Sequence, residues 1–120
     1  MSEEKKTAVA SDDGEKKLLS MLGLAARARA LVFGTPMICD SLQKSKGKGK
    51  RILLVLEASD TSDNTHKRIT DKCRFYGVRH YRLVSGGETL SHAVGKSGML
   101  SAVALTDTQL CHAVENLLPT

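Results

Sequence analysis

The clearest secondary-structure signals lie in ILLVLEASDTSDNTHKRITDKCRFYGVRHYRLV, residues 52–84. Its opening run, Ile52 to Leu56, is apolar without interruption, which is typical of a strand buried on both faces. Several capping side chains then precede a predicted helix over about 64–76, and Gly77 ends that helix. A second strand is predicted over 78–84. A strand, a helix and another strand in this order indicate an α/β protein.

The rest of the chain continues this alternation. Helices are predicted over residues 15–28, 35–44, 89–94 and 107–118, and short strands over 31–33 and 101–105. Strands that alternate with helices imply a central sheet covered on both sides. We therefore predict a three-layer α/β/α sandwich with a central, mostly four-stranded mixed sheet and about five helices.

The length of 120 residues fits one domain. Residues 1–14 mix Ser, Glu, Lys, Asp and Ala without periodicity, so we predict a disordered tail or linker there and one folded α/β/α domain over 15–118. The amino terminus has no apolar run of the signal-peptide type, and no segment approaches the ~20 apolar residues that span a bilayer. We expect a cytoplasmic, monomeric protein with no membrane partner.

The charge of the chain favours a polyanionic partner. The formal net charge is +5, and residues 1–17 hold five acids and four bases, a net of −1, so about +6 remains on the rest. A basic domain favours nucleic acid. With only two Phe, two Tyr and no Trp, recognition by base stacking is disfavoured. The alternative is a soluble protein with surplus Lys and Arg and no such partner.

No residue pattern supports catalysis, a metal site or a cofactor. Cys39, Cys73 and Cys111 form no CxxC pair, so we predict small apolar core residues rather than zinc ligands or disulfides. The four histidines have no ligand spacing to one another, and His66 and His112 are predicted to face solvent.

The glycine pair at residues 86–87 lacks the surroundings of a phosphate-binding loop, which favours a tight turn.

Two groups of basic residues are candidates for phosphate contacts. Five of them fall within eight positions of one another: Lys44, Lys46, Lys48, Lys50 and Arg51. Such a cluster can displace several counterions from RNA, although a solvated flexible loop explains it equally well. Arg27 and Arg29 lie shortly before Gly34 and the start of the second predicted helix, where free N–H groups suit RNA phosphates.

Three segments resemble the ribosomal protein L-seven-Ae / L-thirty-e family, in particular its small bacterial members. They are LGLAARARALVFG at 22–34, EASDTSDNTHKRITDKCRFYGV at 57–78 and LSHAVGK at 90–96. The resemblance implies an α/β/α sandwich that binds RNA, often a kink-turn with tandem sheared G·A pairs.

In that family the contacts come from the loop after the first short strand, the start of the second helix and the loop before the last strand. Gly34 matches the family glycine that lets the backbone approach RNA, and Thr35 suits the small polar position after it. Met99 and Leu100 fall in the loop that packs apolar groups against a flipped-out nucleotide.

The chain departs from the family at the positions that read the G·A pairs. Kink-turn binders carry Asn, Glu and Lys where this sequence has Pro36, Met37 and Asp40. The resemblance therefore implies the fold, but it does not imply standard kink-turn recognition.

These observations predict a non-catalytic RNA-binding protein, ribosomal or ribosome-associated, whose partner is a structured RNA such as ribosomal RNA. The predicted RNA-binding residues are Arg27, Arg29, Gly34, Thr35, Lys44, Lys46, Lys48, Lys50, Arg51, Met99 and Leu100. Two alternatives stay open: a protein-interaction module on the same scaffold, and the recognition domain of a larger RNA-modifying assembly.

Overall fold

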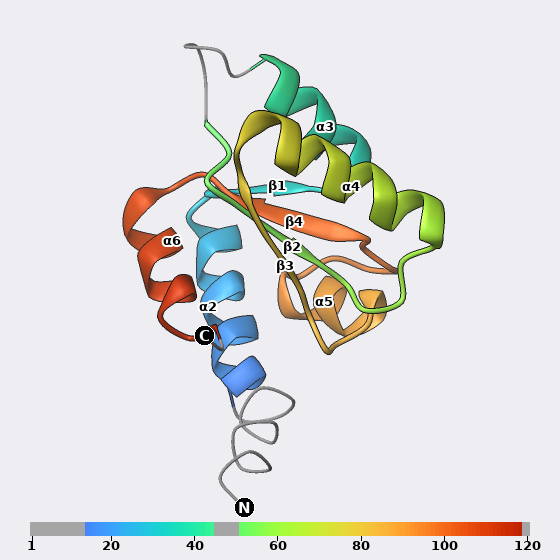
Figure 1. The fold of residues 1–120 in the computed structure, drawn as a ribbon. Coiled ribbons are helices and arrows are strands. Elements are labelled where there is room, and N and C mark those ends of the chain that lie inside the picture. Colours follow the sequence, from blue (N-terminus) through green and yellow to red (C-terminus); the bar gives the residue numbers. More distant parts are fainter. Residues whose placement is uncertain (1–13, 45–50, 119–120) are drawn as a thin grey trace, which may run out of the picture.

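A computed structural model describes residues 14–44 and 51–118 of the chain. Helices and strands alternate through these residues (Figure 1). In chain order they are α2 (Gly14–Arg27), β1 (Leu31–Phe33), α3 (Thr35–Lys44), β2 (Leu54–Glu57), α4 (Asp63–Tyr76), β3 (Arg79–Arg82), α5 (Gly87–Ala93), β4 (Ala102–Leu105) and α6 (Thr108–Glu115). The predicted alternation is confirmed.

The four strands form one mixed sheet in the order β1-β4-β2-β3. Strand β2 is parallel to β3, whereas β4 is antiparallel to both β1 and β2. Strands β1, β2 and β3 therefore run in the same direction. Their last residues and the first residue of β4 form one end of the sheet, the carboxyl end, and the opposite end is the amino end.

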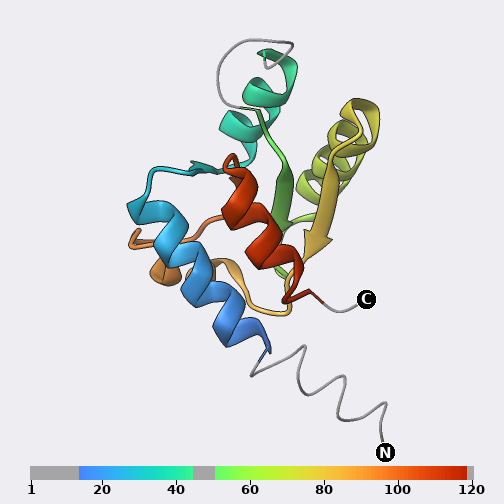
Figure 2. The same ribbon diagram turned by 90° about the vertical axis from the view of Figure 1, so that its left-hand side faces the viewer.

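Helices cover both faces of this sheet, as the two perpendicular views show (Figures 1 and 2). Helices α3 and α4 pack on one face, where Ile38, Ile69 and Cys73 surround Val55 of β2. Helices α2, α5 and α6 pack on the other face against Leu54 and Leu56. The two cores follow from the alternation of side chains along β2. The predicted three-layer sandwich is confirmed.

The ends of most elements differ from the prediction by one to three residues, and two of these differences bear on the candidate sites. Strand β2 was expected over 52–56, but it covers Leu54–Glu57 because these four residues pair with β3 on one side and β4 on the other. Helix α5 begins at Gly87 rather than Thr89, with Gly86 as its N-cap. The glycine pair is thus a helix start and not a tight turn, and the Gly87 N–H donates to Asp60 Oδ1 at 2.9 Å.

The three cysteines are buried and unpaired, as predicted. Of the predicted tail over residues 1–14, residues 1–13 lie outside the described residues, whereas Gly14 is the first residue of α2. Lys46, Lys48 and Lys50 also lie outside the described residues. Among the helices described, none combines the length and the apolar character that crossing a membrane requires.

Candidate nucleic-acid interface

The turn from β1 into α3 lies at the carboxyl end of the sheet. Gly34 occupies it with a φ of +86°, a conformation that residues with a Cβ rarely adopt. Its N–H donates to the carbonyl of Ala102 at 2.9 Å, and its own carbonyl accepts from Ile38 at 3.0 Å. The glycine therefore lets the chain leave the edge strand and enter α3 within one residue.

A pair of hydroxyl groups joins this turn to the segment before β4. Thr35 Oγ1 lies 2.6 Å from Ser101 Oγ, and the Thr35 N–H donates to the same Ser101 oxygen at 3.2 Å. Nearby, Lys96 Nζ stands 4.6 Å from the centre of the Phe33 ring, a cation–π contact. This Thr35–Ser101 junction places the predicted residues Gly34 and Thr35 beside Ser101, which directly follows the predicted residues Met99 and Leu100.

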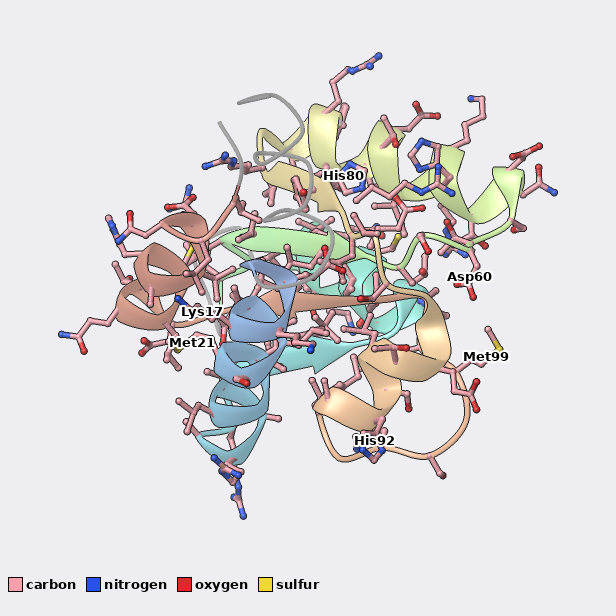
Figure 3. All side chains as sticks on the ribbon, turned by 90° about the horizontal axis from the view of Figure 1, so that it is seen from below. Lys17, Met21, Asp60, His80, His92 and Met99 are labelled. Atoms are coloured by element: carbon pink, nitrogen blue, oxygen red, sulfur yellow. The ribbon has the colours of Figure 1, made fainter. Side chains whose placement is uncertain are left out.

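A pocket of about 280 Å³ opens next to the junction. Its lining comes from the loop after β2, the start of α4 and the segment before β4: Asp60, Thr61, Ser62, Thr65, Met99, Leu100 and Ser101. Figure 3 shows Asp60 and Met99 at the same end of the molecule. Because Met99 is 67% exposed, an apolar side chain stands at the mouth of a partly polar pocket.

The predicted basic residues lie at the other end of the sheet. Arg27 and Arg29 precede β1, and Arg51 precedes β2, so all three are at the amino end and exposed. Lys44 is the last residue of α3, whose ten residues span about 15 Å from Thr35. The structure therefore separates Gly34, Thr35, Met99 and Leu100 from the described members of the basic set.

The residues that depart from the family pattern are on the first two turns of α3. Pro36 has no N–H to donate, and Met37 is 57% exposed. Asp40 Oδ2 pairs with Lys44 Nζ at 3.3 Å, four residues further along the helix. The exposed start of α3 thus offers an apolar side chain where the family's kink-turn binders have polar ones.

A buried carboxylate near the pocket was not predicted from the sequence. Glu57, the last residue of β2, is fully buried. His66 Nδ1 lies 2.8 and 2.9 Å from its two oxygens, and His80 Nε2 lies 2.7 Å from Oε1. Thr61 also donates its hydroxyl to Glu57. His66 is half-buried, with 38% of its side chain exposed, so the prediction that it faces solvent holds only in part, whereas His112 is exposed as predicted.

The pKa of Glu57 reflects two opposed effects. Burial raises it, but the hydrogen bonds from Thr61, His66 and His80 together outweigh burial and hold the pKa below its ordinary value. The carboxylate is therefore charged at neutral pH. The alternation of side chains along β2 could have indicated that Glu57 is buried, since it turns residue 57 to the same face as Val55, toward α4.

Comparison with known proteins shows to which family the chain belongs. No model of a known protein family matches it. The RNA-binding protein YlxQ of Bacillus subtilis (strain 168) is 36% identical over 98 residues, which cover 82% of this chain and 91% of that protein. The chain belongs to the YlxQ family. The RNA-binding protein YlxQ of Enterococcus faecium is 30% identical over 86 residues, covering 72% of this chain and 78% of that protein.

Two solved structures share the fold of this YlxQ-family chain. A Bacillus halodurans protein of unknown function has a TM-score of 0.74 at 30% identity and covers 84% of this chain and 95% of its own. The Giardia lamblia 15.5kD RNA binding protein has a TM-score of 0.70 at 20% identity, covering 90% and 87%. The second likeness shows the fold alone. Together with the YlxQ relatives, these matches support the L-seven-Ae-type fold expected from the resemblance.

Proposed function

We propose that the chain binds structured RNA without catalysing a reaction, and that the carboxyl end of the sheet recognises the RNA. The observation that carries this proposal is the Thr35–Ser101 junction, which brings the β1–α3 turn and the segment before β4 together beside a pocket. Both relatives in the YlxQ family are named RNA-binding proteins, which supports the same ligand.

The chemistry of this end suits a splayed-out nucleotide. The exposed thioether of Met99 offers an apolar surface for the face of a base. The Ser62 and Thr65 side chains in the pocket can hydrogen-bond to base edges or to a ribose hydroxyl. Because Pro36, Met37 and Asp40 replace the residues that read G·A pairs, the RNA is recognised through its shape and an unstacked base.

The basic residues at the amino end have a different part in the proposal. Arg27 and Arg29 stand before edge strand β1, whose three residues span about 10 Å. Lys44 stands at the far end of α3. A duplex that continues from the recognised nucleotide along β1 and α3 would bring its phosphates to these side chains. They then add affinity that depends on salt but not on sequence.

The test is a binding titration with a kink-turn RNA and a matched duplex lacking the G·A pairs, each at two salt concentrations. We expect Met99→Ala to weaken binding of the kink-turn RNA selectively. Arg27→Ala should weaken binding to both RNAs and lower the salt slope by about one. Arg74→Ala, on the exposed side of α4, is the matched control and should change neither. Failure of the unaltered chain to bind either RNA refutes the proposal.

A second candidate function, a protein-interaction module, has one observation in its favour. Phe75 is 79% exposed on α4 and lines a groove with Gln43, Asp71, Lys72 and Tyr76. An exposed aromatic side chain of this size is typical of protein interfaces. Absence of RNA binding, with an unaffected fold, would favour this reading.

A further inference from the structure

We propose that Glu57, His66 and His80 form a binding site for a divalent transition-metal ion, for which Zn²⁺ is the probe. The three residues come from three elements: the end of β2, the first turn of α4 and the middle of β3. One ligand atom from each residue lies within 4.8 Å of the other two. Two imidazole nitrogens and one carboxylate form a ligand set common to zinc and to non-haem iron.

The fold positions each of these side chains independently. Glu57 follows the alternation of β2 onto the face covered by α4. His80 pairs with Val55 in the parallel register, so it shares that face. On α4, His66 is three residues before Ile69 and seven before Cys73, which are the buried residues of that helix. It therefore lies on the stripe that faces the sheet.

The separations of the ligand atoms fit a small cation. With metal–ligand bonds of about 2.1 Å, two ligand atoms lie roughly 3.0 Å apart at a right angle and roughly 3.4 Å apart at the tetrahedral angle. The nitrogen–oxygen distances of 2.7 to 2.9 Å are close to the right-angle value. The two imidazole nitrogens lie within 4.8 Å of each other, and the His66 side chain, which is 38% exposed, has room to adjust toward tetrahedral geometry.

Solvent reaches the cluster from one side. The partial exposure of His66 gives an ion a path to the ligands, whereas His80 is only 16% exposed and Glu57 is closed off. A site with three protein ligands and one solvent-facing position leaves that position for water. Thr61, whose hydroxyl donates to Glu57, stands next to the ligands and lines the pocket described above.

Arg82 is the neighbour that opposes an ion. Its Nε lies 3.8 Å from Glu57 Oε2, and its Nη2 donates to the Ser59 carbonyl at 3.1 Å and to Thr61 Oγ1 at 3.3 Å. The guanidinium balances part of the carboxylate charge when no ion is bound, and it repels a divalent ion when one is bound. Because its side chain is 41% exposed, it has room to turn away.

The experiment uses the full chain after treatment with EDTA and its removal. Zn²⁺ is titrated by calorimetry, and Co²⁺ by its visible absorption, which distinguishes nitrogen and oxygen ligands from cysteine sulfur. We expect one ion per chain. At a hundredfold excess of Zn²⁺ over its Kd, we expect a rise in Tm of roughly 10 °C.

Variants of the ligands assign the site. His66→Ala, His80→Asn and Glu57→Gln should each weaken Zn²⁺ binding by roughly a hundredfold. His92→Ala should leave it unchanged, because His92 is exposed on α5, across the sheet from His80 (Figure 3). Circular dichroism of each metal-free variant checks that it is folded.

A gain-of-affinity variant keeps the proposal testable if the ligand variants fail to fold. Arg82→Gln removes the opposing charge and should tighten Zn²⁺ binding roughly three- to tenfold. The proposal is overturned if the chain binds neither ion below about 0.1 mM. It is also overturned if His92→Ala loses as much affinity as His66→Ala, or if the Co²⁺ spectrum is that of a thiolate complex.

Discussion

Replacing Gly87 by alanine tests how tightly α5 packs against the segment before β4. A Cβ at this position would lie 2.7 Å from the carbonyl oxygen of Leu100, a backbone atom that cannot rotate away. The Leu100 N–H donates to the Gly87 carbonyl at 3.1 Å, so the clash also strains that hydrogen bond. Overpacking costs about 1–3 kcal/mol, and the hydrogen bond contributes about 1 kcal/mol.

One effect of the substitution is favourable. Gly87 has no positive φ, so alanine gains about 0.5–1 kcal/mol by restricting the unfolded chain. The net loss in free energy of unfolding is therefore about 1–3 kcal/mol, which corresponds to a fall in Tm of roughly 5–20 °C for a domain of this size.

Urea and thermal denaturation of Gly87→Ala measure this loss directly. The comparison is Gly98→Ala, where φ is +82° but no atom lies within 4 Å of the added Cβ. That variant should lose only about 1 kcal/mol from backbone strain. If Gly87→Ala is as stable as the unaltered chain, or loses clearly less than Gly98→Ala, the close approach of α5 to Leu100 is not a real constraint.

Three further predictions concern single interactions. In a double-mutant cycle of Thr35→Val and Ser101→Ala, each single change should lower the free energy of unfolding by about 1–3 kcal/mol, as measured by urea denaturation. Additive losses in the double variant would show that the two hydroxyl groups do not interact. Burial raises the pKa of the Cys73 thiol from 9.0 to about 11, so the folded state favours the protonated thiol. The protonated thiol therefore stabilises the fold fully below pH 9, and about 3 kcal/mol of the free energy of unfolding is lost as the pH rises to about 11. Between pH 8 and pH 10.5, the denaturation midpoint should therefore fall less for Cys73→Ala than for the unaltered chain. Equal falls in the two proteins would contradict this. The Asp107 side chain caps α6 by accepting from the Leu110 N–H at 2.9 Å. Asp107→Ala should therefore lower the free energy of unfolding by about 1 kcal/mol in thermal denaturation, and Asp107→Asn by much less. Equal losses would show that this cap does not stabilise the helix.

Local patterns predicted most of the fold because each element carries its own signal. Helix α4 was predicted over about 64–76 from several capping side chains before it and Gly77 after it, and the structure shows it over Asp63–Tyr76 with Ser62 as the N-cap and Gly77 as the C-cap. The boundary of β2 was less predictable, since Glu57 belongs to the strand only through its pairing with β3 and β4. A charged residue at the end of an apolar run gives no sign of such pairing.

The candidate sites depended on long-range contacts, which a single sequence does not reveal. His66 and His80 are nine and twenty-three residues from Glu57, too far apart for any helix or strand periodicity to connect them. The predicted RNA-binding residues were grouped by proximity along the chain. Arg29 and Gly34, five residues apart in sequence, nevertheless lie at opposite ends of β1, because an extended strand separates its neighbours quickly.

Thr61 belongs to both proposed sites. Its hydroxyl donates to Glu57, and the same residue lines the pocket beside Met99. Coupling between two ligands is reciprocal. If an ion held by Glu57 shifts Thr61 and strengthens RNA binding tenfold, bound RNA must strengthen the affinity for that ion tenfold as well. The concentration of free RNA would then help to determine how much of the protein carries metal, and the supply of metal would determine how much carries RNA.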